Sequence, residues 1–177
     1  MDFGRALRTS FSIGNGRKLK EGEVDETEQV SWGQGLIGVA ILVVVQLGLI
    51  FWPNGERLDA AIIRDLGIVA FVALVVPFIL FWLGAMMTGT MSRLPAAFLY
   101  LGIALAVLQL VSALLASFGA GQSGFVIGLL FAVTFLAARG FLKMGWFPAI
   151  VIGLLVVAGF IGAGLLLLML PSGRLLR

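Results

Sequence analysis

The stretch AARGFLKMGWFPA, residues 137–149, places Arg139 and Lys143 between two long apolar runs. No other charged residue occurs between Leu94 and Leu170. Two cations in this position either form an ion site inside a membrane or mark the point where the chain leaves it. The choice between these readings decides how often the chain crosses a bilayer.

The composition of the chain is that of an integral membrane protein. Hydrophobic residues make up 60% of the 177 residues, charged residues make up 12%, and the mean hydropathy is +1.12. Ordinary soluble domains contain about 45–50% apolar and about 25% charged residues. The composition predicts an all-α membrane domain, and the length allows one compact bundle of a few spans.

The residue types that are missing argue against catalysis. The chain contains no Cys and no His, which excludes disulfides and thiolate-bound clusters and removes the commonest general base and metal ligand. No stretch matches a catalytic or phosphate-binding motif. We therefore expect a protein that is not an enzyme, with no catalytic, metal or cofactor residues to name and the cofactor, if any, unknown. The net charge of +3 is read as a membrane-topology signal, so no nucleic acid partner is expected.

Five apolar runs are long enough, or nearly so, for the roughly 20 residues that a bilayer core requires. Pro77 lies inside the second run and predicts a kink near Ala73. The expected spans are residues 32–52, 66–87, 94–117, 124–142 and 147–170.

The fourth run is the short one, because it offers only residues 124–138 before Arg139. A stretch of this length can be re-entrant, which leaves four spans plus one re-entrant segment as the alternative. Long cationic side chains, however, reach an interface from within a helix end. If the side chains of Arg139 and Lys143 reach the interface, the segment extends to Leu142 and is long enough to cross the bilayer.

The distribution of cations orients the five spans. With the N-terminus in the cytoplasm, the inside segments hold eight cations and the outside segments hold four. The inside cations are Arg5, Arg8, Arg17, Lys18, Lys20, Arg93, Arg139 and Lys143, and the outside ones are Arg57, Arg64, Arg174 and Arg177. The positive-inside rule, by which Lys and Arg gather on the cytoplasmic side, favours a cytoplasmic N-terminus and an outward C-terminus. Arg93, Arg139, Lys143 and Trp146 are then topology anchors at the cytoplasmic surface.

Residues 1–31 form a polar cytoplasmic head before the first span. Phe3, Leu7 and Phe11 recur at the spacing of a short amphipathic helix and are expected to lie on the membrane surface. The charged stretch that follows Gly14 to Gly16 is read as a solvated linker, with a docking strip for a partner as the alternative. Residues 171–177 form a short C-terminal tail.

Polar and small residues inside the spans point to helix packing. Gln46 and Gln109 are expected to hydrogen-bond between helices, or, in a second reading, to line a polar cavity together with the Pro77 kink. Ala158, Gly159, Gly162 and Ala163 form small-xxx-small pairs that let another helix approach closely. That helix belongs either to the same bundle or to another subunit.

The stretch TFLAARGFLKMGWFPAIVIGLLVVAGF, residues 134–160, resembles the junction between the fourth and fifth helices of the Yip1-like membrane family. The polar head and five closely spaced spans resemble the same family in layout. The Asp-Leu-Tyr-Gly-Pro type of signature found in eukaryotic members is absent, so a trafficking GTPase is not expected as a partner. The resemblance implies a non-enzymatic scaffold.

These observations predict an accessory, scaffold or assembly subunit of a bacterial inner (plasma) membrane. Its expected partners are membrane lipids and another membrane protein or a second copy of itself. The alternative is a small transporter or channel for a lipid or a neutral solute.

Overall fold

The computed structural model describes residues 3–15, 26–54, 60–117 and 124–169. The C-terminal tail, most of the charged linker and the cations at positions 17, 18, 20, 57, 174 and 177 lie outside the described residues. All regular structure within those ranges is helical. The elements are α1 (Phe3–Gly14), η1 (Glu26–Gln29), α2 (Trp32–Asn54), α3 (Ala60–Thr88), η2 (Met91–Arg93), α4 (Leu94–Ser117), α5 (Gly124–Phe141) and α6 (Trp146–Met169).

Five of these helices, α2 to α6, are long and apolar enough to cross a membrane. At 1.5 Å per residue, 18 residues span about 27 Å, close to the thickness of a bilayer core. The short fourth run forms the continuous helix α5, which reaches this length. Large apolar side chains are exposed along the outside of the long helices, among them Val44, Phe71 and Leu114.

Helix α3 differs from the predicted second span. It begins at Ala60, six residues before the expected start at Leu66, and thereby includes Arg64 and Asp65. The predicted span began after Arg64 and Asp65 because it was defined by an uncharged apolar stretch. A helix can continue beyond such a stretch, because its backbone hydrogen bonds do not depend on side-chain polarity. Pro77 is buried inside this helix, which runs on to Thr88.

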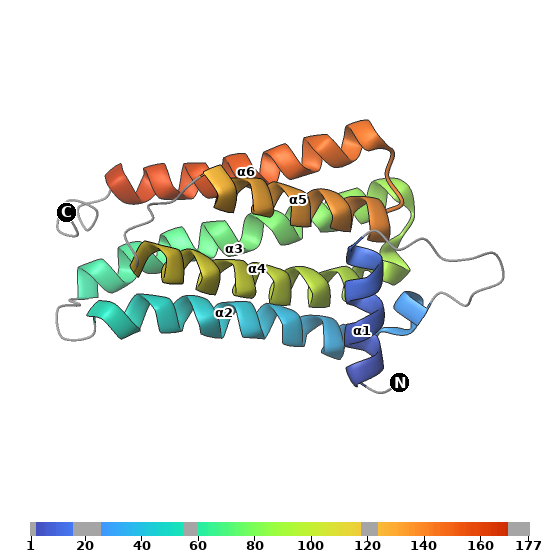
Figure 1. The fold of residues 1–177 in the computed structure, drawn as a ribbon, viewed down its shortest axis with the longest axis horizontal. Coiled ribbons are helices and arrows are strands. Elements are labelled where there is room, and N and C mark those ends of the chain that lie inside the picture. Colours follow the sequence, from blue (N-terminus) through green and yellow to red (C-terminus); the bar gives the residue numbers. More distant parts are fainter. Residues whose placement is uncertain (1–2, 16–25, 55–59, 118–123, 170–177) are drawn as a thin grey trace.

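Figure 1 shows α2 to α6 lying side by side with alternating directions, and α1 lying across one end of the bundle. We call this end, which also contains η1, η2 and the turn of residues 142–145, the head end. The opposite end, where α2 and α4 finish and α3 and α5 begin, is called the far end.

The closest helix packing joins α2 and α4, which make the most extensive contact in the molecule. Gly38 of α2 faces Gly102 of α4, and a Cβ atom on Gly102 would overlap the backbone of Gly38. Gly35 meets the backbone of Pro95 in the same way, one turn closer to the head end. Glycine is required at these positions because the two backbones touch without side chains between them.

The core is concentrated at the head end. All ten buried residues of α4 lie between Leu94 and Ala106, in the half of the helix nearer to α1. Phe81, Phe141 and Leu142 complete this core from α3, α5 and the turn that follows α5. The far half of α4 contributes no buried residue, so the packing there is looser.

Candidate functional site

Helix α1 docks onto the head end of the bundle through its apolar face. Ala6, Ser10 and Ile13 are buried there, and α1 contacts α4 and α5. The ring of Phe11 meets Tyr100 edge-on, with 5.1 Å between ring centroids. Asn15, directly after the helix, accepts a hydrogen bond of 2.9 Å from the Tyr100 hydroxyl to its Oδ1 atom.

The face that the sequence assigned to the membrane surface is therefore used largely within the chain. Leu7 and Phe11 are partly buried and pack against the core, whereas Phe3 is 39% exposed. An amphipathic pattern predicts that one face is buried but does not specify whether protein or lipid covers it. Here a large part of the cover is α4 and α5.

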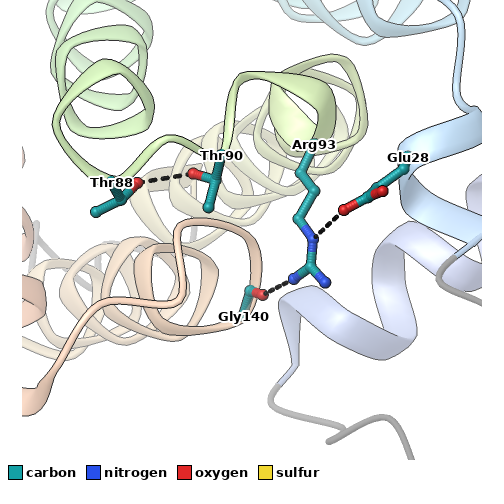
Figure 2. A network of polar contacts seen from close by, with 5 residues as sticks. All are labelled: Glu28, Thr88, Thr90, Arg93 and Gly140. Atoms are coloured by element: carbon teal, nitrogen blue, oxygen red, sulfur yellow. Dashed lines mark hydrogen bonds and ion pairs between the residues drawn. The ribbon is translucent and has the colours of Figure 1, made fainter. Parts of the chain in front are cut away.

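Arg93 is the central polar residue of the head end, as Figure 2 shows. It is 4% exposed, and its Nη1 donates a hydrogen bond of 3.3 Å to the carbonyl oxygen of Gly140 in the last turn of α5. Its Nε lies 3.5 Å from Oε1 of Glu28 in η1. Carbonyls of a last helical turn lack intrahelical partners and favour a cation nearby. Arg93 thus joins the end of α5 to the segment that leads into α2.

Arg93 was predicted only as a topology anchor, and its contacts in the structure go beyond that role. The sequence placed it in a short loop at the membrane surface, whereas the structure buries it among three elements, η2, η1 and α5. The short turn before it contains Gly89 at φ 68°, a conformation that glycine adopts without strain. Thr88 and Thr90 flank this glycine, and their hydroxyls lie 2.8 Å apart (Figure 2).

Arg139 and Lys143 occupy the connection between α5 and α6. The guanidinium carbon of Arg139 lies 4.0 Å from the centre of the Trp146 ring, a cation–π contact between the end of one helix and the start of the next. Lys143 is exposed in the turn at φ 50°. These positions correspond to a turn at the helix ends, not to an ion site in the middle of the spans.

The small residues of α6 divide between two faces. A Cβ atom on Gly159 would lie 2.7 Å from Cγ1 of Val76 in α3, and Ala163 is buried. This pair packs inside the bundle. Ala158 and Gly162 are exposed on another face of α6, and a Cβ atom on Gly162 would meet no heavy atom within 4 Å.

The far half of the bundle contains a cavity of about 710 Å³. Its walls come mainly from α4, α5 and α6, with Leu49 from α2. Gln109 and Ser112 are the polar residues of the wall, and Pro77 and Gln46 do not contribute to it. Of the three residues that the second reading assigned to a polar cavity, Gln109 is the one that lines this cavity.

Gln109 also differs from its expected role as a hydrogen-bonding residue between helices. Its Oε1 atom is buried and has no hydrogen-bond partner in the described part of the chain. Leaving a buried acceptor unpaired costs about 1–3 kcal/mol. The neighbouring helices therefore leave this amide oxygen available to another donor.

Asp65, near the start of α3, is a second buried polar residue outside the head end. Its side chain is only 1% exposed, although it precedes the expected start of the second span at Leu66. Its Oδ1 accepts hydrogen bonds of 3.0 and 2.9 Å from the neighbouring Arg64. Within the described ranges, no three His, Cys, Asp or Glu residues gather into a group that could hold a metal ion.

Sequence reasoning missed the residues that hold the head in place. Tyr100, Asn15 and Glu28 were assigned no role, and the linker was read as solvated although Thr9 donates a 3.0 Å hydrogen bond to Glu26. One available signal was Tyr100, the only tyrosine of the chain, in the first turns of an otherwise apolar span. Another signal was the position of the glycines: Gly35 and Gly38 lie near the start of the first span, and Gly102 lies near the start of the third.

No known protein family, curated protein or solved structure matches the chain.

Proposed function

We propose that this chain is a multi-pass membrane protein that acts without catalysis as an accessory, scaffold or assembly subunit. Its five long helices cross the bilayer, and another membrane protein or a second copy of the chain binds the exposed face of α6. The layout of a head followed by five helices is also what the resemblance to the Yip1-like family implies.

The exposed pair Ala158 and Gly162 carries this proposal. Between helices in lipid the driving forces are close packing and hydrogen bonds, because lipid tails solvate large apolar side chains as well as a protein does. A face without bulky side chains lets a second backbone approach. The space beside Gly162 is open, whereas the neighbouring pair Gly159 and Ala163 already packs inside the bundle.

The charge distribution supports a cytoplasmic head end in a bacterial inner membrane. Arg5, Arg8, Arg93, Arg139 and Lys143 all belong to the head end, and Arg64 is the only described cation at the far end. Lys and Arg are enriched on the cytoplasmic side of membrane proteins.

The test is a set of leucine substitutions on α6. Gly162→Leu and Ala158→Leu should remove the partner from the complex purified in mild detergent, while insertion and the unfolding temperature stay unchanged. Gly159→Leu is the matched contrast, because Leu there meets Val76 and should lower the unfolding temperature of the isolated chain. Retention of the partner, or of the self-associated form, by both exposed variants would remove α6 as the contact surface.

The cavity favours a second candidate function, a transporter for a lipid or neutral solute. Its walls are mostly apolar and none of the described lining residues is charged, so it would suit an uncharged cargo. Flux of a neutral lipid between the leaflets of protein-containing vesicles, compared with protein-free vesicles, separates transport from a stationary scaffold role.

A further inference from the structure

We infer that the far-half cavity binds a neutral lipid whose polar end is a hydroxyl group. The inference rests on the placement of the bundle in a membrane but not on the scaffold role. The cavity volume of about 710 Å³ lies within the range of roughly 300–1,000 Å³ that ligand pockets occupy. The cavity borders the core, since Leu105 and Leu130 belong to both, but none of its lining residues belongs to α1 or to the glycine contact between α2 and α4.

The walls select an apolar body for the ligand. Leu105 and Leu108 of α4, Val126 and Leu130 of α5, and Phe160 of α6 surround the space. None of the lining residues is charged. An ionised carboxylate or phosphate would lose its hydration here without gaining a partner of opposite charge, which disfavours fatty acid anions and charged headgroups.

Gln109 selects a hydrogen-bond donor at the polar end. The residue lies in the cavity wall, and its buried Oε1 has no partner among the described residues. The terminal torsion of a Gln side chain is broad and roughly two-fold, so rotation of the amide can turn this oxygen toward the cavity. A hydroxyl group donates to it and also accepts from the amide nitrogen, which satisfies both halves of the amide.

The depth of Gln109 excludes a phospholipid headgroup as that donor. Gln109 lies eight residues before the end of α4 at Ser117, which corresponds to about 12 Å along the helix. A bilayer core is about 30 Å thick, so this amide lies well inside the hydrocarbon region. Only a lipid with a small uncharged polar end places its hydroxyl at this depth.

The experiment uses the purified full chain in phosphatidylcholine vesicles with photoreactive probes. The probes are a long-chain alcohol with a mid-chain diazirine, the matching fatty acid, and a phosphatidylcholine with the same diazirine. Mass spectrometry of the labelled peptides should place the alcohol on the cavity-lining parts of α4, α5 and α6. Labelling of these peptides by the acid and by the phospholipid should be at least ten-fold weaker.

Two variants and a control separate cavity binding from contact with bulk lipid. Gln109→Leu keeps the size of the side chain and should reduce labelling by the alcohol about ten-fold, the effect of one lost hydrogen bond. Ala113→Phe fills the cavity and should abolish labelling, whereas Leu114→Phe, on the 58% exposed outer position next to it, should leave labelling unchanged.

The folding of each variant is checked by its unfolding temperature. Gln109→Leu removes an unpaired buried oxygen and should leave that temperature unchanged or raise it, so this variant stays informative even if Ala113→Phe does not fold. Equal labelling by alcohol and acid, preferential labelling by the phospholipid, or full labelling of Gln109→Leu would each overturn the inference. Loss of a protein partner from the α6 variants has no bearing on these readouts.

Discussion

Arg93 shows how one buried cation can organise the end of a helical bundle. It links the last turn of α5 to η1, the segment that connects the head with α2. The ion pair with Glu28 is partly open to solvent, since the Glu28 side chain is 49% exposed, and its own contribution is correspondingly small. The hydrogen bond to the Gly140 carbonyl is the more protected contact, because Arg93 is buried.

Replacement of Arg93 by Met should loosen the head without unfolding the bundle. We expect local destabilisation of about 2 kcal/mol, the usual contribution of hydrogen bonds to a charged group. The measurement is hydrogen exchange of the backbone amides in α1 and η1. Arg8→Met is the control, because Arg8 is exposed on α1 and should not change the exchange rates. Equal exchange in the two variants would contradict the role assigned to Arg93.

A second prediction concerns Gly140, which lies where α5 contacts the end of α1. A Cβ atom there would overlap the carbonyl oxygen of Ile13, so Gly140→Ala should push α1 away from α5 and cost about 1–3 kcal/mol. Gly128→Ala in the same helix meets no neighbour and should be neutral or stabilising by up to about 1 kcal/mol. Limited proteolysis of the head, compared between these two variants, checks the opposite signs.

Among the elements, the α2–α4 pair is held by a close approach of two backbones. Gly38 and Gly102 leave no room for a side chain, and the backbone of Leu99 in α4 also lies against Gly38. This is the packing mode of small residues in membrane helices, found here within the chain and not only on α6.

Gly102→Ala should separate α2 from α4 and lower the unfolding temperature in detergent, with a cost of about 1–3 kcal/mol. Gly48→Ala on α2 is the matched control, because no atom lies within 4 Å of the added methyl group. An unchanged unfolding temperature for Gly102→Ala would show that this helix pair is not held as the structure describes.

For the whole molecule, the two halves of the bundle differ in packing. The head end combines a docked helix, a buried Arg and all ten buried residues of α4, whereas the far half contains a cavity. The head end can hold the molecule together while the cavity in the far half accommodates a ligand. Both proposals use the far half, since Ala158, Gly162 and most residues of the cavity wall lie there.

The direction of insertion is open to direct measurement because the chain contains no Cys. In intact cells, Lys143→Cys at the head end should be protected from an impermeant thiol reagent, and Arg64→Cys at the far end should be labelled. Both side chains are exposed in the structure, so a difference in labelling reports the side of the membrane and not burial within the protein. Labelling of Lys143→Cys from outside, with protection of Arg64→Cys, would reverse the proposed orientation.

The sequence by itself determined the number and order of the five long helices and, to within two residues, the ends of four of them. Apolar length and helix-ending residues are local properties, and so α4 starts and ends at the predicted residues. Helix α5 ends one residue early, α6 is shifted by one residue at both ends, and α2 ends two residues late. The early start of α3 is the exception, because a helix continues through charges that a hydropathy criterion excludes. Arg93, Arg139 and Lys143 lie at one end of the bundle because the connections that contain them are separated by two spans of opposite direction.

Only the tertiary structure decided what each face touches. A small-residue or amphipathic pattern shows that a face is suited to close contact, but several partners satisfy the same pattern. Leu7 and Phe11 therefore meet the bundle, Gly159 meets α3, and the tightest helix pair is α2 with α4. The cavity beside Gln109 likewise depends on how α4, α5 and α6 are placed against one another, which is set by contacts between residues far apart in the chain and has no local signature.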